Sequence, residues 1–161
     1  MKKPFHPALR LLAVFGVMVT GISVVGASIL HAAGTSDACK LLMTSEILKA
    51  TGLTVGDGTA GRPIPGVLGR CTWVGSGNTK VIVTLTDAQH METTIAVQQK
   101  EGTSVPGVGS KAVAIKSAGF TGGGYILSFL DAQGGIGVSI LGKDGTLDRV
   151  VALAKVVESH R

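Results

Sequence analysis

The sequence predicts an α+β domain in which helices pack on one antiparallel β-sheet. The expected elements after residue 34 run in the order α-β-β-α-β-β-β-α. Successive strands are separated by short turns, which favour antiparallel pairing, and the amphipathic helices need one sheet face to cover. We therefore expect residues 35–161 to form a single domain, because their length suits one hydrophobic core and leaves no room for a second.

Residues 1–34 have the features of an export signal. Lys2, Lys3 and Arg10 precede an uncharged apolar run at residues 11–30, and small residues follow at 32–34. This pattern predicts a signal peptide that is removed after Gly34. A run of about 20 apolar residues also suits an uncleaved N-terminal membrane anchor, so both alternatives stay open. In either case we expect a periplasmic or extracellular domain, and an uncleaved leader would tether it to the inner membrane through residues 11–30.

The first part of the exported chain predicts a helix followed by a glycine-rich segment. Apolar residues recur at helical spacing over 37–50, and Gly52 is suited to end the helix. Thr44 and Ser45 mark an alternative start for a second helix. Residues 52–70 are rich in glycine and proline, so we expect a short strand near 53–55 and then an irregular loop over 56–69. We predict this loop to be the most mobile part of the domain and a plausible lid.

The remaining chain predicts two groups of strands and two helices. A hairpin is expected from strands at 71–74 and 80–86, joined by the turn at 75–78. A helix over 91–100 follows, with Asp87 as its cap. Strands at 112–116, 125–130 and 135–141 then form a meander. An apolar stripe predicts a last helix over 147–157, capped by Asp144 or Thr146.

Composition and charge exclude several function classes. The formal net charge is +5, but three of the fifteen basic residues lie in the leader and none of the ten acidic ones do, so the exported part is close to neutral. Its basic residues are scattered, and the chain has one Trp and one Tyr, so we expect no nucleic-acid partner. The few histidines have no neighbours at ligand spacing, so we expect neither a metal nor a cofactor.

Cys39 and Cys71 are the only two cysteines of the chain. An exported protein enters an oxidising compartment, where two such residues usually form a disulfide. The bond would join the first helix to a strand across the glycine-rich segment. Closing a loop of this size stabilises the folded state by about 3.5–4 kcal/mol.

Two further residues are candidates for function. Trp73 lies close to the second cysteine, where it either packs in the core or lines a ligand pocket. His90 follows Asp87 by three positions, and a small hydrolase would need a nucleophile brought to it from elsewhere in the chain. No Gly-x-Ser-x-Gly elbow is present, so a solvated histidine on a helix is the simpler interpretation. The glycine-rich segment at 107–111 precedes a strand, so we interpret it as a turn and not as a phosphate-binding loop.

Several short motifs, taken in order, resemble a known family. The motifs are Cys-Lys-Leu-Leu at 39–42 with Glu46 and Gly52, Cys-Thr-Trp at 71–73, and Gly-Val-Gly at 107–109. Over residues 38–157 they resemble an exported bacterial domain of unknown function that is common among actinobacterial lipoproteins. The chain departs from this pattern at Met43, where the family has Thr, and it lacks the lipobox cysteine. The resemblance implies a two-cysteine crosslink, a PsbP-like arrangement of helices on an antiparallel sheet, and no established enzyme activity.

We therefore predict a non-catalytic binding or accessory module of the bacterial cell envelope. Its expected partner is an envelope protein or a small apolar ligand, with Trp73 as the candidate binding residue and no catalytic residues. The alternative is a small envelope hydrolase that uses His90.

Overall fold

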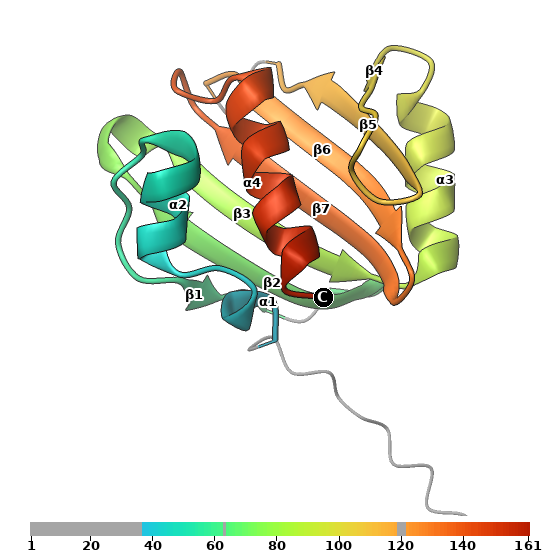
Figure 1. Ribbon diagram of the computed structural model, residues 1–161, viewed down its shortest axis with the longest axis horizontal. Coiled ribbons are helices and arrows are strands. Elements are labelled where there is room, and N and C mark those ends of the chain that lie inside the picture. The colour runs from blue at the N-terminus through green and yellow to red at the C-terminus, as the bar shows by residue number, and fades with distance from the viewer. Residues whose placement is uncertain (1–36, 63, 119–121) are drawn as a thin grey trace, which may run out of the picture. The chain divides into compact units, whose positions relative to one another are not determined.

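Seven antiparallel strands form one sheet that carries helices on both faces (Figure 1). The computed structural model describes residues 37–62, 64–118 and 122–161. This confirms the predicted α+β class with helices packed on an antiparallel sheet. The predicted leader at 1–34 lies outside the described residues. Within the described ranges, no helix is long and apolar enough to cross a membrane.

The helices and strands alternate along the chain largely as the sequence pattern indicates. The helices are α1 (Asp37–Lys40), α2 (Thr44–Thr51), α3 (Ala88–Gln98) and α4 (Leu147–Ser159), with a short 3-10 turn η1 (Ser76–Asn78). The strands are β1 (Thr59–Ala60), β2 (Val67–Val74), β3 (Lys80–Thr86), β4 (Thr103–Ser104), β5 (Lys111–Lys116), β6 (Gly124–Asp131) and β7 (Gly134–Leu141).

The strand order in the sheet is β1-β2-β3-β7-β6-β5-β4, so β7 lies at its centre. The glycine-rich start of β7 is paired on both sides, with Thr86 of β3 and Leu130 of β6 opposite Gly135. This glycine-rich segment is therefore an interior part of the sheet and not an exposed edge. The two edges are instead the two-residue strands β1 and β4, and such short edges offer little backbone to a pairing partner.

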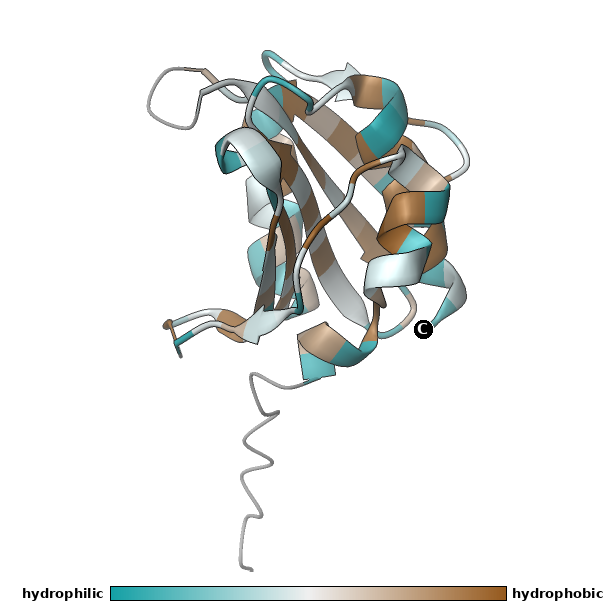
Figure 2. Cartoon of the chain, turned by 90° about the vertical axis from the view of Figure 1, so that its left-hand side faces the viewer, coloured by the Kyte–Doolittle hydropathy of each residue, from teal (hydrophilic) through white to brown (hydrophobic). Residues whose placement is uncertain are grey.

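One face of the sheet carries α1, α2 and α4 and holds the main hydrophobic core. Alternate residues of the strands point to this side, as the period of two in a β-strand requires. The largest fully buried side chains of this core include Trp73, Phe129 and Leu153. Figure 2 shows the apolar residues concentrated in the strands and on the helix surfaces that face them.

The opposite face carries α3, which contacts β5, β6 and β7. Its side chains Met91 and Ile95 form a second, smaller cluster with Val113 and Leu130. The helix sits very close to the sheet at Gly135, where an added Cβ would lie 2.2 Å from the Met91 Cβ. Only glycine permits this approach, because real Cβ atoms do not come within 3.0 Å of such a neighbour.

Three predicted elements need correction. The first helix is two helices, and α2 begins after Met43, whose backbone N–H donates to the Glu46 carboxylate at 2.8 Å. The expected strand near 53–55 is only an isolated bridge between Val55 and Gly75. The expected irregular loop at 56–69 contains β1 and the first residues of β2, because backbone pairing with neighbouring strands outweighs the low strand propensity of its glycines.

Candidate functional site

The predicted disulfide joins Cys39 of α1 to Cys71 of β2. The two Cα atoms lie 5.0 Å apart, well inside the range that a disulfide allows. Cys71 is fully buried and belongs to the main core. The bond therefore fixes the short helix α1 onto the sheet, as the sequence analysis expects, and it leaves no free cysteine among the described residues.

Trp73 lies beside the disulfide and is 2% exposed. Gly58 covers its indole so closely that an added Cβ would lie 2.7 Å from Nε1 and 2.8 Å from the Cys71 Sγ. A shallow hollow bounded by Met43, Asp57 and Gly58 reaches the ring. Trp73 is therefore chiefly a core residue, and its predicted role in binding stays untested.

His90 is the third residue of α3 and is exposed. Its backbone N–H donates to the Asp87 carboxylate at 2.7 Å, which confirms Asp87 as the helix cap. Its ring packs against Gly66, where an added Cβ would lie 3.1 Å from Nδ1. Among the described side chains, none with a hydroxyl or carboxylate is hydrogen-bonded to this ring. Asp87, Gln89 and Thr93 line a small hollow with His90, and the hydrolase alternative stays a prediction.

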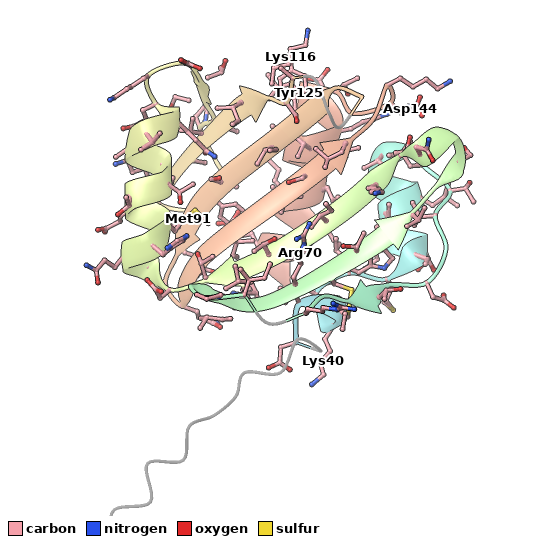
Figure 3. The ribbon with its side chains drawn as sticks, turned by 180° about the vertical axis from the view of Figure 1, so that it is seen from behind. Lys40, Arg70, Met91, Lys116, Tyr125 and Asp144 are labelled. Atoms are coloured by element: carbon pink, nitrogen blue, oxygen red, sulfur yellow. A yellow bond between two sulfur atoms is a disulfide. The ribbon has the colours of Figure 1, made fainter. Side chains whose placement is uncertain are left out.

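The part of the second sheet face that α3 leaves uncovered forms a broad surface over β2, β3, β7 and β6 (Figure 3). Most side chains on it are half-buried, and many are small or carry a hydroxyl group. The strand register brings them together in rows, for example Arg70 opposite Thr84, and Thr84 opposite Gly137. We call this surface the open face; its residues are Arg70, Thr72, Val74, Ile82, Thr84, Ile126, Ser128, Gly137, Ser139 and Leu141.

Gly135 and Gly137 mark the boundary between the covered and the open part of this sheet face. An added Cβ at Gly135 would clash with α3, as described above. At Gly137, two residues further along the same strand, the nearest atom to an added Cβ is the Thr84 Cβ at an ordinary 3.7 Å. No other described atom lies within 4 Å of that position, so a side chain added at Gly137 would meet no steric obstacle at the centre of the open face.

Arg70 of β2 is a charged residue on the open face, in the same row as Thr84 and Gly137. Its aliphatic stem packs beside Gly61, and its Nε is buried without a hydrogen-bond partner among the described residues. No described carboxylate forms an ion pair with its guanidinium. A buried donor without a partner is costly, so the Nε of Arg70 destabilises this position unless water reaches it.

A second hollow lies on the other side of the sheet, between α4 and the segment after β4. It is lined mainly by apolar groups, including Val105, Pro106, Val151 and Ala152. Asp148 and Lys155 are the charged residues of its lining. This groove serves below as the comparison site for the open face.

The most buried ion pair among the described residues has a structural role. Arg161 lies against Asp131 at the end of β6, with Nε donating to the carboxylate at 2.9 Å, and both side chains are at most 15% exposed. Burial raises the pKa of Asp131. The hydrogen bonds from Arg161 and the Gln133 backbone, together with the guanidinium charge, outweigh this and hold the pKa below its ordinary value. This pair anchors the segment after α4 to the sheet.

The sequence analysis did not identify the open face. The sequence does contain a pattern that indicates this face. Small and hydroxyl residues occur at positions 84, 137 and 139, on the side of each strand opposite the core. This pattern alone does not separate a ligand surface from an ordinary solvated sheet face. Within the described ranges, no three His, Cys, Asp or Glu residues form a metal-binding group.

No known protein family, curated protein or solved structure matches the chain. The resemblance of residues 38–157 to an exported domain of unknown function therefore stays a prediction.

Proposed function

We propose that this protein is a non-catalytic, exported binding module of the cell envelope, and that the open face holds a small ligand. The observation that carries the proposal is the open face itself: α3 packs over β5, β6 and part of β7, and beside it only the Thr84 Cβ lies within 4 Å of an added Cβ at Gly137. Ligand sites are typically concave and mostly apolar, with a few polar groups that fix orientation. The open face combines Ile82 and Ile126 with hydroxyl groups and a single arginine.

The disulfide supports the exported location. Such bonds persist in oxidising compartments and are rare in the cytosol. The bond also holds α1 onto the core face, so the crosslink lies on the side of the sheet opposite the open face. A rigid scaffold of this kind suits a site formed from strand side chains.

Binding of a neutral fluorescent probe, N-phenyl-1-naphthylamine, tests this proposal. We expect its emission to rise on addition of the wild-type domain. Gly137→Phe places a large side chain at the centre of the open face and should weaken probe binding by about tenfold or more, since several apolar contacts are lost. Ala152→Phe fills the α4 groove by a similar volume and should leave binding unchanged.

Two results contradict the proposal. No emission change with the wild-type domain would show that the open face takes up no such ligand. Loss of binding in Ala152→Phe, with normal binding in Gly137→Phe, would move the site to the α4 groove. Urea unfolding of both variants checks that each is folded.

A further inference from the structure

We propose that a polar pocket at the start of α4 binds a small zwitterion of the α-amino acid class, with its carboxylate on Arg149 and its ammonium group on Asp144. This pocket shares no lining residue with the open face, so the inference goes beyond the proposed function and does not depend on it. It commits to a dissolved small molecule that carries one charge of each sign.

Three connections of the chain meet to form this pocket, which we call the end pocket. They are the segment after α2, the turn between β2 and β3, and the segment from β7 into α4; the lining residues are Gly52, Leu53, Thr54, Gly75, Ser76, Thr79, Asp144 and Arg149. Asp144 lies at the end of the sheet where β2 turns into β3 (Figure 3). The Gly75 N–H donates to the Thr79 carbonyl at 2.8 Å, and Gly75 also pairs with Val55. Backbone bonds therefore hold two of the walls in place, as a preformed site requires.

The size and lining of the end pocket suit a small polar ligand. Its volume is about 290 Å³, close to the lower limit of the roughly 300–1,000 Å³ that is typical of ligand sites. Leu53 is the one large apolar side chain of its lining. An apolar molecule would gain little in this pocket, whereas the hydroxyl groups of Thr54 and Ser76 offer hydrogen bonds to a polar one.

The end pocket contains a positive and a negative side chain that do not pair with each other. The Arg149 Nη1 donates to the backbone carbonyl of Asp144 at 2.8 Å, and the Asp144 carboxylate accepts from the Thr79 hydroxyl at 2.9 Å. Thr79 is 2% exposed, so it orients this carboxylate from inside the protein. Among the described residues, neither charge forms an ion pair. Each charged group is thus positioned by a neutral one, which leaves the second carboxylate oxygen and the other guanidinium N–H groups for a ligand.

This arrangement matches both charges of a zwitterion. A guanidinium presents paired N–H donors to a carboxylate, and a carboxylate accepts hydrogen bonds from an ammonium group. The two helix ends at the pocket add to the match. Arg149 lies in the first turn of α4, where the helix dipole favours an anionic group, and Gly52 follows the last residue of α2, where the dipole favours a cationic one. A ligand with a single charge would leave one of the two side chains without a partner.

Amide chemical-shift titration of the wild-type domain with three related probes tests the inference. L-alanine carries both charges, L-alanine amide lacks the carboxylate, and N-acetyl-L-alanine lacks the ammonium group. We expect L-alanine to bind at least about tenfold more tightly than either derivative, because each derivative loses one charge-assisted hydrogen-bonded contact. The largest shifts should occur at Thr54, Ser76 and Asp144, with little change at Gly137.

Two substitutions assign each charge of the ligand to its side chain. Arg149→Gln keeps a donor for the Asp144 carbonyl, and it should weaken L-alanine binding by about tenfold to a hundredfold without weakening that of L-alanine amide. Asp144→Asn keeps an acceptor for Thr79, and it should weaken L-alanine binding over the same range without weakening that of N-acetyl-L-alanine. Lys155→Gln removes a charge of α4 outside the end pocket and should leave L-alanine binding unchanged. Urea unfolding checks that each variant is folded.

Two results would overturn the inference. One is the absence of L-alanine shifts at the end pocket of the wild-type domain. The other is equal binding of L-alanine and either derivative, which would indicate a site for a single charge. The comparison of the three probes needs no substitution, so it decides the question even if a variant fails to fold. Because the two sites share no residue, the binding of N-phenyl-1-naphthylamine to the open face is decided separately.

Discussion

Replacing Gly135 by alanine should displace α3, whereas the same change at Gly137 should not. At Gly135 the new methyl would lie 2.2 Å from the Met91 Cβ and 2.4 Å from the Thr86 Oγ1. The Met91 Cβ is fixed to the helix backbone, so α3 itself must move by more than 1 Å to restore an ordinary contact of about 3.4 Å. At Gly137 the nearest atom is 3.7 Å away, which needs no movement.

The magnitude follows from what holds α3 in place. Its buried anchors are Met91 and Ile95, each of which contributes about 1.5–3 kcal/mol when buried. Overpacking alone costs about 1–3 kcal/mol, and moving the helix forfeits part of the anchor burial. We expect Gly135→Ala to lower the free energy of unfolding by about 2–4 kcal/mol. Gly137→Ala should raise it by about 0.5 kcal/mol, because alanine suits a strand better than glycine.

Urea unfolding followed by tryptophan fluorescence measures both variants, since Trp73 is the one tryptophan and lies on the opposite side of the sheet. Hydrogen exchange over residues 88–98 provides a local readout, and it should be faster in Gly135→Ala alone. Equal unfolding free energies in the two variants, within about 0.5 kcal/mol, would refute the assignment of covered and open halves.

Three further predictions concern the core and the ion pair. Gly58→Ala should lower the free energy of unfolding by about 1–3 kcal/mol, because the new methyl meets the Trp73 indole and the disulfide. Gly56→Ala is the control: its methyl would make only a 3.7 Å contact, so the free energy of unfolding should change by less than about 0.5 kcal/mol in the same urea assay. Replacing Cys39 and Cys71 together by alanine should cost about 3.5–4 kcal/mol, and a thermal midpoint unchanged from the wild-type protein would count against a structural crosslink. Asp131→Asn should cost about 1–2 kcal/mol at neutral pH. Because the folded pKa of this carboxyl lies below its ordinary value, the wild-type advantage should disappear as the pH falls below about 4; an advantage that persists in acid would contradict the ion pair.

Much of the fold could be predicted because local signals and tertiary packing agree. The alternation in β3 and the stripe in α4 predict their own burial, and Thr146 caps α4 as expected. The prediction failed over 56–69 because β1 exists only through pairing with β2, a contact that glycine-rich local sequence does not encode. Thr44 indicates a helix start in the sequence and so predicts the split between α1 and α2. Glu46 stabilises that start, because its carboxylate accepts the Met43 N–H.

The candidate site was harder to predict, because it depends on which part of a sheet face a helix leaves uncovered. The sequence gives no reason for α3 to pack over β5 and β6 and not over β2 and β3; the strand order decides this. Gly135 and Gly137 look alike in the sequence, yet Gly135 lies in close contact with α3 and Gly137 lies on the uncovered part of the face. For Trp73 the sequence leaves open a core role and a binding role. Its burial beside the disulfide makes it chiefly a core residue.

Backbone amide chemical-shift mapping during titration with N-phenyl-1-naphthylamine locates a bound ligand without any substitution. We expect the largest shifts at Arg70, Thr84, Gly137 and Ser139, with little change in α4. Shifts concentrated at Val151 and Ala152, or no shifts at a ligand excess, would contradict a binding site on the open face.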